Sequence, residues 1–409
     1  MGQCPFTGNI STEKKVSYLV PIKELSSDSD FNNIHSWLEE KRKNSSIEYD
    51  EDRGVWNVYS YEDVEEVFKD HKRFSVKRTN VVETPFRSIL NLDPPDHTKM
   101  RRLVSKAFSP KTIQSLSPTI DKVSTQLLEE FVSHNEVDIM NDYAYPLTIS
   151  MLTSLLGVPF KDKDLFRYWS ESLIAVPEED SEEAYQNAIS MSREMMGNID
   201  AYLLNIIKER RQEQQDDLIS SLITAEIDGE LLSDREIRDF GGLLLQAGFG
   251  TTARLISNSV RCIIETPGLQ QQLREDPSLI SLAIEEILRL YASIYRTTRF
   301  ALEDVTIQGK EIKAGEELSL WISSANRDAD KFENPHQFDM GRGRNNHISF
   351  GKGIHLCIGA PLARLEAEIA IKNLLAATEW ISFKDEEFKP IKSLIANGLR
   401  ELRIQIDKK

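Results

Sequence analysis

Cysteine is scarce in this chain of 409 residues. Three are present, Cys4, Cys262 and Cys357, and they stand far apart in the sequence. An odd number at wide spacing does not build a disulfide framework. Zinc is also a poor fit, because His355 and Cys357 are only two residues apart and no second ligand pair stands at zinc-finger spacing. Each cysteine therefore has to be judged by its own surroundings.

The sequence also has no long apolar run and no targeting signal. No segment reaches the roughly 18 apolar residues that are needed to cross a bilayer. The N-terminus MGQCPFTGNISTEKK lacks the apolar core of a signal peptide, and Phe6 stands where a myristoylation signal places Ser or Thr. These absences predict a cytoplasmic protein with no membrane interaction.

Positive charge is in deficit, and linker-like segments are missing. The formal net charge of −16 argues against general binding to nucleic acid, although it leaves room for a local basic patch. No stretch rich in Pro, Ser or Gly and no abrupt change of composition divides the chain. With 40% hydrophobic and 28% charged residues, it is expected to form one globular domain over 1–409, with an N-terminal extension over about 1–30.

Helical spacing dominates what is present. It runs from Pro110 to Arg211 and is broken by GVPFKD and AVPEEDSEE. Strand patterns are short: SIEYDEDRGVWNVYS predicts a hairpin before a helix from about Tyr61, VTIQGKEIKAG a hairpin around Gln308 and Gly309, ELSLWISS a further strand, and ANGLRELRIQI a terminal hairpin. The predicted fold class is mainly α with small β-sheets, without the strand–helix alternation of a parallel barrel or a dinucleotide-binding fold.

The surroundings of Cys357 are chemically unusual. Glycines flank it in FGKGIHLCIG, and an amphipathic helix begins directly after it, with Pro361 suited to the first turn. Backbone N–H groups and the helix dipole at such an N-terminus favour a thiolate over a thiol. Neighbouring glycines let the backbone approach a flat, bulky group. This pattern suits a single thiolate ligand to a metal or haem, whereas the plain alternative is a buried free cysteine in a turn.

The stretch from Phe350 to Gly359 matches the pattern Phe-Gly-x-Gly-x-His-x-Cys-x-Gly, and the chain therefore resembles the cytochrome P450 family. The resemblance extends from about Trp37 to the C-terminal strands and is strongest to soluble bacterial members, in particular Bacillus-type hydroxylases of fatty acids, terpenoids and steroids. It implies the cytochrome P450 fold, with haem b between a long distal helix and the Cys loop with its proximal helix. Cys357 is then the iron ligand, and Phe350 and Gly359 lie against the cofactor.

The resemblance assigns roles to charged residues elsewhere. Glu286 and Arg289, three apart on one helix face, match a Glu-x-x-Arg pair, and Arg342 closes a network that fixes the architecture behind the haem loop. The haem propionates need cationic or hydrogen-bonding partners. The matching positions for those partners are His97, Arg101, Arg299 and His355.

The stretch LLLQAGFGTTARL, Leu243 to Leu255, matches the distal helix of the family. Two glycines and adjacent threonines are weak helix formers, and a local distortion is therefore expected there. By resemblance Ala247 and Gly248 leave space for O2, and Thr251 holds O2 and its water by hydrogen bonds.

One position departs from the pattern of the family. Gly250 stands where Asp or Glu is usual, which removes the partner in proton delivery. We hypothesise that Gln246, four residues earlier, holds a water chain through the space at Gly250. The alternative is an enzyme that couples poorly and releases peroxide.

The segments that contact substrate in the family are mostly apolar here, which predicts an apolar small molecule. They supply the candidate pocket residues Phe86, Ile89, Ile174, Leu243, Ile294 and Ile395, each of which could equally be plain core.

The reaction implied is a monooxygenation: one atom of O2 enters a C–H bond and the other is reduced to water. Electrons are expected from a separate ferredoxin or flavodoxin with its reductase, docking on a monomer near Lys352, Arg102 and Lys106. The alternatives are a peroxide-driven hydroxylase or decarboxylase and a non-catalytic haem sensor, to which Cys4 gives a faint hint.

Overall fold

The computed structural model describes residues 17–77, 88–132, 134–174, 177, 181–227, 229–342 and 345–408. Its α-helices are α1 (Asp28–Asn32), α2 (Ile34–Asn44), α3 (Tyr61–Lys69), α4 (Asp96–Ala107), α5 (Pro110–Ser115), α6 (Ser117–Phe131), α7 (Tyr145–Leu156), α8 (Lys163–Ile174), α9 (Glu182–Gln212), α10 (Leu218–Ile223), α11 (Asp234–Ala247), α12 (Gly250–Glu265), α13 (Leu269–Glu275), α14 (Ile280–Leu290), α15 (Ile322–Ala325) and α16 (Ala360–Ala377). The strands are β1 (Ile47–Asp50), β2 (Val55–Val58), β3 (Phe74–Ser75), β4 (Glu136–Asp138), β5 (Glu226–Ile227), β6 (Glu230–Leu231), β7 (Thr297–Ala301), β8 (Val305–Ile307), β9 (Lys310–Ile312), β10 (Glu317–Leu320), β11 (Thr378–Phe383), β12 (Lys389–Pro390), β13 (Leu399–Glu401) and β14 (Arg403–Lys408).

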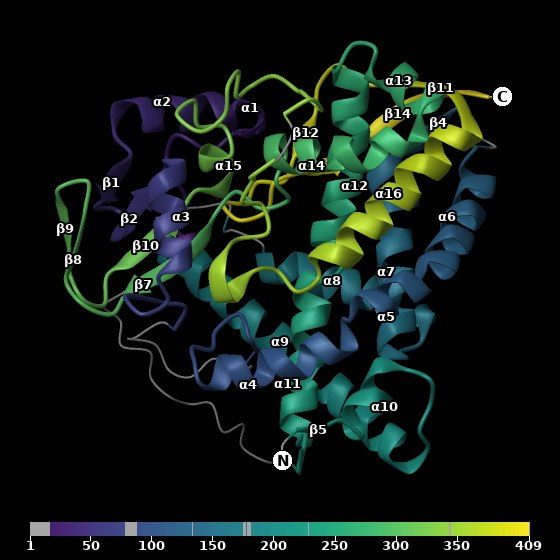
Figure 1. Cartoon of the computed structure of the whole chain (residues 1–409), viewed down its shortest axis with the longest axis horizontal. Helices are drawn as coiled ribbons and strands as arrows, with labels where there is room; N and C mark the ends of the chain where they lie inside the picture. The colour runs from purple at the N-terminus through teal and green to yellow at the C-terminus, as the bar shows by residue number, and fades with distance from the viewer. Residues whose placement is uncertain are drawn as a thin grey trace.

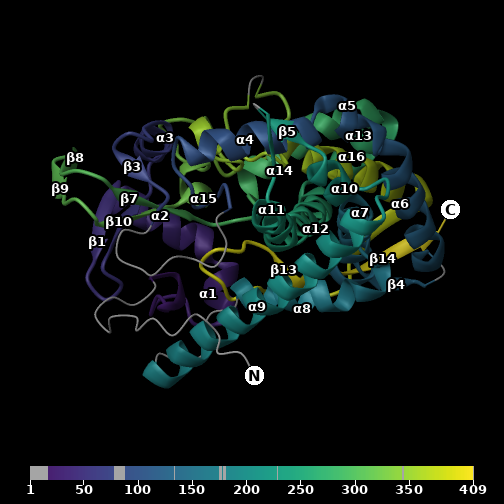
Figure 2. The same cartoon turned by 90° about the horizontal axis from the view of Figure 1, so that it is seen from below.

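The molecule has a sheet-rich side and a helical side (Figure 1). A five-stranded sheet in the order β1-β2-β10-β7-β3 lies on the sheet-rich side, with β10 parallel to β2 and the other pairs antiparallel. On the helical side, α11 and α12 occupy the centre, and Figure 2 looks almost along them. Helix α16 packs against α12, α14 and α6. The predicted class, mainly α with small sheets, is confirmed.

Two predicted hairpins are confirmed. Strands β1 and β2 pair antiparallel from Ile47 opposite Val58 to Asp50 opposite Val55, and α3 begins at Tyr61 as expected. Strands β8 and β9 pair around Gln308 and Gly309, which adopt φ values of 48° and 73°. Positive φ at both central residues gives the turn a twist that matches the flanking strands, which explains why a short sequence signal was sufficient.

The terminal hairpin predicted from ANGLRELRIQI is wrong. Strand β13 pairs with β12, whereas β14 pairs with β11 on one side and with β4 on the other. The adjacent strands β13 and β14 thus join different sheets, with Leu402 buried between them. Strand β4 also interrupts the stretch from Pro110 to Arg211 that the periodicity assigned to helix. A run of three residues carries too little pattern to reveal a partner far away in the sequence.

The largest apolar cluster fills the helical side around α12 and α16, and a second lies under the five-stranded sheet. A third contains Ile22, Leu25 and Phe31, so part of the segment assigned to an N-terminal extension is buried against Trp321. Within the described ranges, no helix combines the length and the apolar character that a bilayer span requires.

Candidate active site

The loop from Phe350 to Gly359 folds back on itself ahead of α16. Gly351 and Gly353 have φ values of 71° and 70°, a region that glycine enters without steric cost. The Cys357 N–H donates to the Phe350 carbonyl at 2.9 Å and closes the loop. Helix α16 follows from Ala360, with a proline in its first turn. The predicted placement of Cys357 at a helix N-terminus is therefore confirmed.

The Cys357 thiol is exposed and free, and its surroundings act on its pKa in both directions. Desolvation by the surrounding protein atoms raises the pKa, whereas the backbone N–H groups of Gly359 and Ala360 and the guanidinium groups of Arg101 and Arg364 lower it. Desolvation prevails, so the pKa of the thiol lies above its usual value, but these donors converge on the sulfur and stabilise the thiolate once it forms. Burial also raises the pKa of Cys262, to about 12, but no backbone N–H group is among the causes that lower it.

Two histidines, one of them in this loop, lie side by side, and each has a ring nitrogen without a partner in the described part of the chain. The rings of His97, on α4, and His355 lie 4.3 Å apart between centroids. The Nε2 atoms of both rings are buried and have no hydrogen-bond partner among the described residues. Burial, together with the nearby charges of Arg299, His97 and Arg101, lowers the pKa of His355 to about 3. The structure therefore brings the four predicted residues together at one spot.

A group with two carboxylates fits this spot. Orphaned, buried donors in a positive environment are costly unless an anion accepts from them. Arg299 is buried and its Nη1 donates to the Thr298 carbonyl at 2.7 Å, while Arg101 Nη1 donates to the Leu356 carbonyl at 2.6 Å. Arg101 thus contacts the Cys loop itself. The donor set and the thiol together fit haem, with two propionates at one edge and a thiolate at the iron.

The expected long distal helix is two helices, α11 and α12, separated at Gly248 and Phe249. The Thr251 hydroxyl donates to the Ala247 carbonyl at 2.7 Å, across the interruption. Ala247, Gly248 and Thr251 are half-buried, whereas Gly250 is buried and Gln246 is exposed. The weak helix positions thus mark a real break, and a regular four-residue spacing between Gln246 and Gly250 is not preserved.

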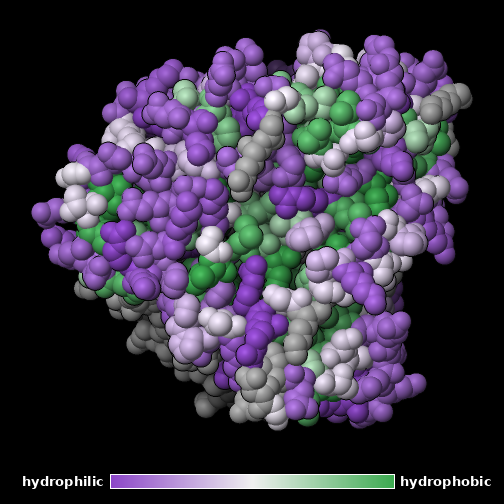
Figure 3. Space-filling model, in the orientation of Figure 1, coloured by the Kyte–Doolittle hydropathy of each residue, from purple (hydrophilic) through white to green (hydrophobic). Residues whose placement is uncertain are grey.

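A cavity of about 600 Å³ opens beside Cys357 on the face that carries α16. Its lining includes Arg101, Phe108, Glu285, Lys352, Cys357 and Arg364. Figure 3 shows apolar residues gathered across the middle of this face, inside a rim of hydrophilic residues.

The expected basic docking patch is partly neutralised on this face. Lys352 pairs with Glu65 and donates to the Tyr61 hydroxyl at 3.0 Å. Arg102 is exposed, and the side chain of Lys106 lies outside the described residues. Sequence reasoning missed the acid beside Lys352, because Glu65 is far away along the chain.

Glu285 is a second acid on this face that sequence reasoning missed, although it directly precedes Glu286. It accepts from Arg364 Nε at 2.5 Å and Nη2 at 2.9 Å, and its Oε2 lies 3.2 Å from His347 Nε2. Burial raises the pKa of Glu285, but the bonds to His347 and Arg364 prevail and lower it from 4.5 to about 2. Glu285 is therefore ionised, and its ion pair with Arg364 connects α14 to α16.

We expect this carboxylate to contribute stability that acid removes. Because its folded pKa lies below its unfolded value, the contribution is complete above pH 4.5 and is lost as the pH falls toward 2. It amounts to at most about 3 kcal/mol. Urea unfolding should show Glu285→Gln less stable than wild type at pH 7, and the difference should shrink to roughly half near pH 3 and close below pH 2. The exposed control Glu129→Gln should match wild type throughout. A difference that is unchanged between pH 7 and pH 3 contradicts this account.

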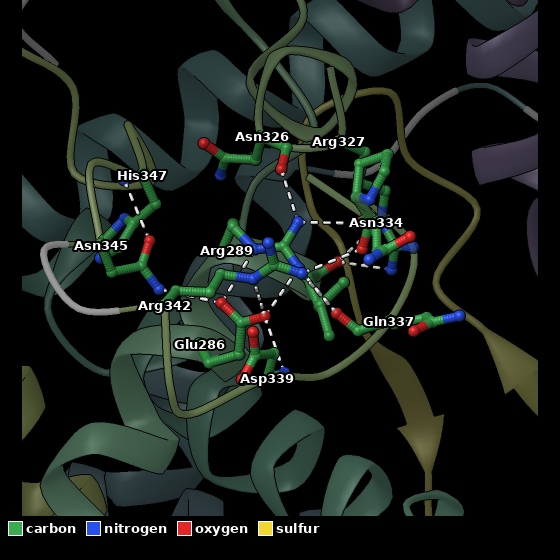
Figure 4. Close-up of polar contacts among 12 residues, drawn as sticks. Glu286, Arg289, Asn326, Arg327, Asn334, Gln337, Asp339, Arg342, Asn345 and His347 are labelled. Carbon is green, nitrogen blue, oxygen red and sulfur yellow. Dashed lines mark hydrogen bonds and ion pairs between the residues drawn. The ribbon is translucent and has the colours of Figure 1, made fainter. Parts of the chain in front are cut away.

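Glu286, Arg289 and Arg342 form the predicted network (Figure 4). Glu286 accepts from Arg289 at 2.7 and 2.8 Å and from Arg342 at 2.8 Å. It also accepts from the Asp339 N–H at 3.1 Å and from Asn345 at 3.0 Å. The Glu286 carboxylate therefore attaches Asp339, Arg342 and Asn345, which precede the Cys loop, to α14.

The predicted pocket residues differ in how deeply they are buried, and some of them lie outside the described residues. Ile89 and Leu243 are buried, and Ile294 and Ile395 are half-buried. Ile294 lies close to Ile395, because Ile294 bridges Ala396 and the Tyr295 N–H donates to the Ile395 carbonyl at 2.7 Å. Phe86, the side chain of Ile174, and Cys4 lie outside the described residues.

Comparison with known proteins agrees with this geometry. A family model described as Cytochrome P450 matches residues 11–406. Cytochrome P450 109 of Bacillus spizizenii is 39% identical over 98% of both chains, and Vitamin D(3) 25-hydroxylase of Pseudonocardia autotrophica is 38% identical over 80% of this chain and 81% of its own. The structure of CYP109E1 from Bacillus megaterium in complex with testosterone superposes with a TM-score of 0.89, at 38% identity, covering 93% of this chain and 99% of that one. The chain belongs to the cytochrome P450 family of haem-thiolate monooxygenases, whose cofactor is haem b.

Proposed function

We propose that this chain hydroxylates an apolar small molecule, a steroid, terpenoid or fatty acid, with one oxygen atom taken from O2. The observation that carries this proposal is that one loop holds both the Cys357 thiol, just before α16, and His355, whose ring lies beside that of His97 and, like it, has an Nε2 without a partner among the described residues. Electrons come from a separate ferredoxin or flavodoxin with its reductase.

In this proposal Cys357 ligates the iron, and His97, Arg101, Arg299 and His355 hold the propionates. When bound, haem supplies the site of O2 activation, and the thiolate ligand promotes O–O cleavage. Phe350 and Gly359 pack against it. Because the Nε2 atoms of the two histidines have no partner among the described residues, propionates would satisfy donors that are otherwise costly to bury.

The distal groups supply positioning and protons. Ala247 and Gly248 leave room at the interruption between α11 and α12, and the Thr251 hydroxyl lies at its edge. Gly250 offers no acid there, and a water held by Gln246, which is exposed on the last turn of α11, delivers the proton instead.

The substrate class follows from the pocket and from the relatives. Ile294 and Ile395 present apolar side chains from two adjacent segments, and Leu243 adds a third from α11. One relative was solved with testosterone and another is named a vitamin D(3) hydroxylase. A rigid, apolar molecule of steroid size is therefore the first candidate.

Spectra and turnover test the proposal directly. Purified holoenzyme should show a red-shifted reduced CO band, and testosterone should displace water from the iron and change the spectrum. With ferredoxin, its reductase and NAD(P)H, we expect hydroxylated product. Product that forms with peroxide and not with the electron-transfer proteins would favour the peroxide-driven alternative, which the missing acid at Gly250 makes the second candidate.

The proton-delivery proposal predicts changes in coupling, the fraction of electrons that end in product. Thr251→Ala and Gln246→Ala should lower coupling several-fold and raise peroxide release, because each removes a hydrogen-bonding group from the path. Gly250→Glu should raise coupling. Product and peroxide per NADPH measure this. Unchanged coupling in both Gln246→Ala and Gly250→Glu would end the water-relay idea while leaving Cys357 and the haem unaffected.

A further inference from the structure

Helix α12 carries a buried arginine one turn beyond Thr251. Arg254 is 4% exposed, its Nε donates to the Ser293 carbonyl at 3.1 Å, and its guanidinium donates to the Tyr145 hydroxyl. Burial lowers the pKa of Arg254, whereas Tyr145 and the more distant Glu171 favour its charged form. No carboxylate of the described residues forms an ion pair with it.

A buried cation held by neutral oxygens is expensive, which raises the question of what it does. The side chain of Arg254 joins α12 to the loop after α14, and this connection indicates its role.

The stem of the same side chain lies against the tip of another loop. A Cβ atom added to Gly398 would stand 2.8 Å from Cδ and 2.9 Å from Cγ of Arg254. The neighbouring Asn397 N–H donates at 3.0 Å to the Ser293 carbonyl, the acceptor that Arg254 also uses. Arg254 thus contacts the segment around Ser293 through its guanidinium group and the segment around Gly398 through its side-chain carbon atoms.

A second polar residue repeats this contact one turn further along α12. Asn258 is buried, and its amide donates to the Tyr291 carbonyl at 3.2 Å and to the Asn397 carbonyl at 3.3 Å. Residues four apart lie on one helix face. Arg254 and Asn258 therefore form a polar stripe that attaches both loop segments to α12.

The two attached segments carry the proposed pocket walls. Ile294 follows Ser293 directly, and Ile395 stands three residues before Gly398. The Tyr295 N–H donates to the Ile395 carbonyl at 2.7 Å, and Ile294 bridges Ala396. The two walls are thus joined to each other by backbone hydrogen bonds, and the stripe attaches both to α12.

We infer that Arg254 is a positioning residue that sets which carbon of the substrate faces the site of oxidation. It acts through the Ser293 and Gly398 segments, because its own guanidinium is buried and already satisfied by two oxygens. Misplacement of a reacting atom by about 1 Å can change rates by about 100-fold. Small shifts of Ile294 and Ile395 relative to Thr251 should therefore change the ratio of products. This inference rests on the proposed function of the pocket.

A double-mutant cycle tests the contact between Arg254 and Gly398. The variants are Arg254→Ala, Gly398→Ala and the double variant, with Arg254→Met as a longer apolar replacement, and the reduced CO spectrum reports an intact haem site. Testosterone is the probe, and its dissociation constant and hydroxylation ratio are the readouts. Gly398→Ala alone should weaken binding and change the product ratio about five-fold or more, because the new methyl group displaces the arginine stem. In the Arg254→Ala background the same substitution should have little effect.

The control is Arg261→Met, since Arg261 lies on the same helix and pairs with Glu265 at 2.8 Å. It should keep the product ratio of wild type. If Arg254→Met keeps both the CO spectrum and the product ratio, or if Gly398→Ala acts equally in both backgrounds, the inference is wrong. Wild-type enzyme that binds testosterone without forming product contradicts the proposed function instead. In that case the dissociation constants of the variants still decide about the contact, because they need no turnover.

Discussion

Cys357→Ala is expected to abolish the red-shifted reduced CO band and to reduce hydroxylation to background. The thiol lies at the N-terminus of α16, where the N–H groups of Gly359 and Ala360 and the charges of Arg101 and Arg364 favour a thiolate. A methyl group removes the only soft anionic ligand that the loop offers. The iron would then lose the donor that promotes O–O cleavage. Difference spectra of reduced, CO-treated protein and product assays measure both effects.

Two comparisons make this result specific to the ligand. Cys262→Ala removes the other cysteine among the described residues, which is buried in α12, and should keep the CO band and activity. Cys357→Ser should bind haem without the red-shifted band, because a serine oxygen is a poor replacement for a thiolate. A Cys357→Ala protein that retained the band and its activity would remove the basis of the assignment.

The sequence was most informative where chemistry and backbone geometry constrain the same few residues. Gly351 and Gly353 are needed for left-handed backbone, and the cysteine for ligation, so a ten-residue pattern carried the loop. The β8–β9 hairpin was equally accessible, because its turn needs two residues with positive φ. Such signals are local, and one sequence contains them completely.

Interactions between distant segments were beyond the reach of the sequence. The misassigned C-terminal strands show this, since β13 and β14 pair with β12, β11 and β4 rather than with each other. For the same reason, the hydrogen bond from Arg254 to the Ser293 carbonyl and the ion pair between Lys352 and Glu65 could not be predicted from the sequence. Alternating polarity reports which face of a strand is buried, and does not report which strand lies beside it.

Glu286→Gln is expected to destabilise the protein by about 3–5 kcal/mol, the usual effect of removing one partner from a buried ion pair. Glu286 is 1% exposed and Arg289 is fully buried, so water cannot replace the lost charge. The amide oxygen can still accept from Arg342 and the Asp339 N–H, but the amide NH2 group would then face the donors of Arg289 Nε and Asn345. Since domains are stable by only about 5–15 kcal/mol, this loss should be visible as reduced haem content and a lower midpoint of urea unfolding.

The loss of stability in Glu286→Gln is large if the charge of Arg289 is left buried without a partner, and a double variant tests this cause. If a stranded Arg289 is the cause, replacing both partners, Glu286→Leu with Arg289→Met, should cost less than the two single substitutions together, because no unpaired charge remains buried. Arg289 also donates to the carbonyls of Asn326, Pro335 and Gln337, so the double variant should not return to wild-type stability. Additive costs would show that Glu286 and Arg289 act independently. The network would then hold the segment before the Cys loop through Arg289 and its carbonyl acceptors, rather than through the charge of Glu286.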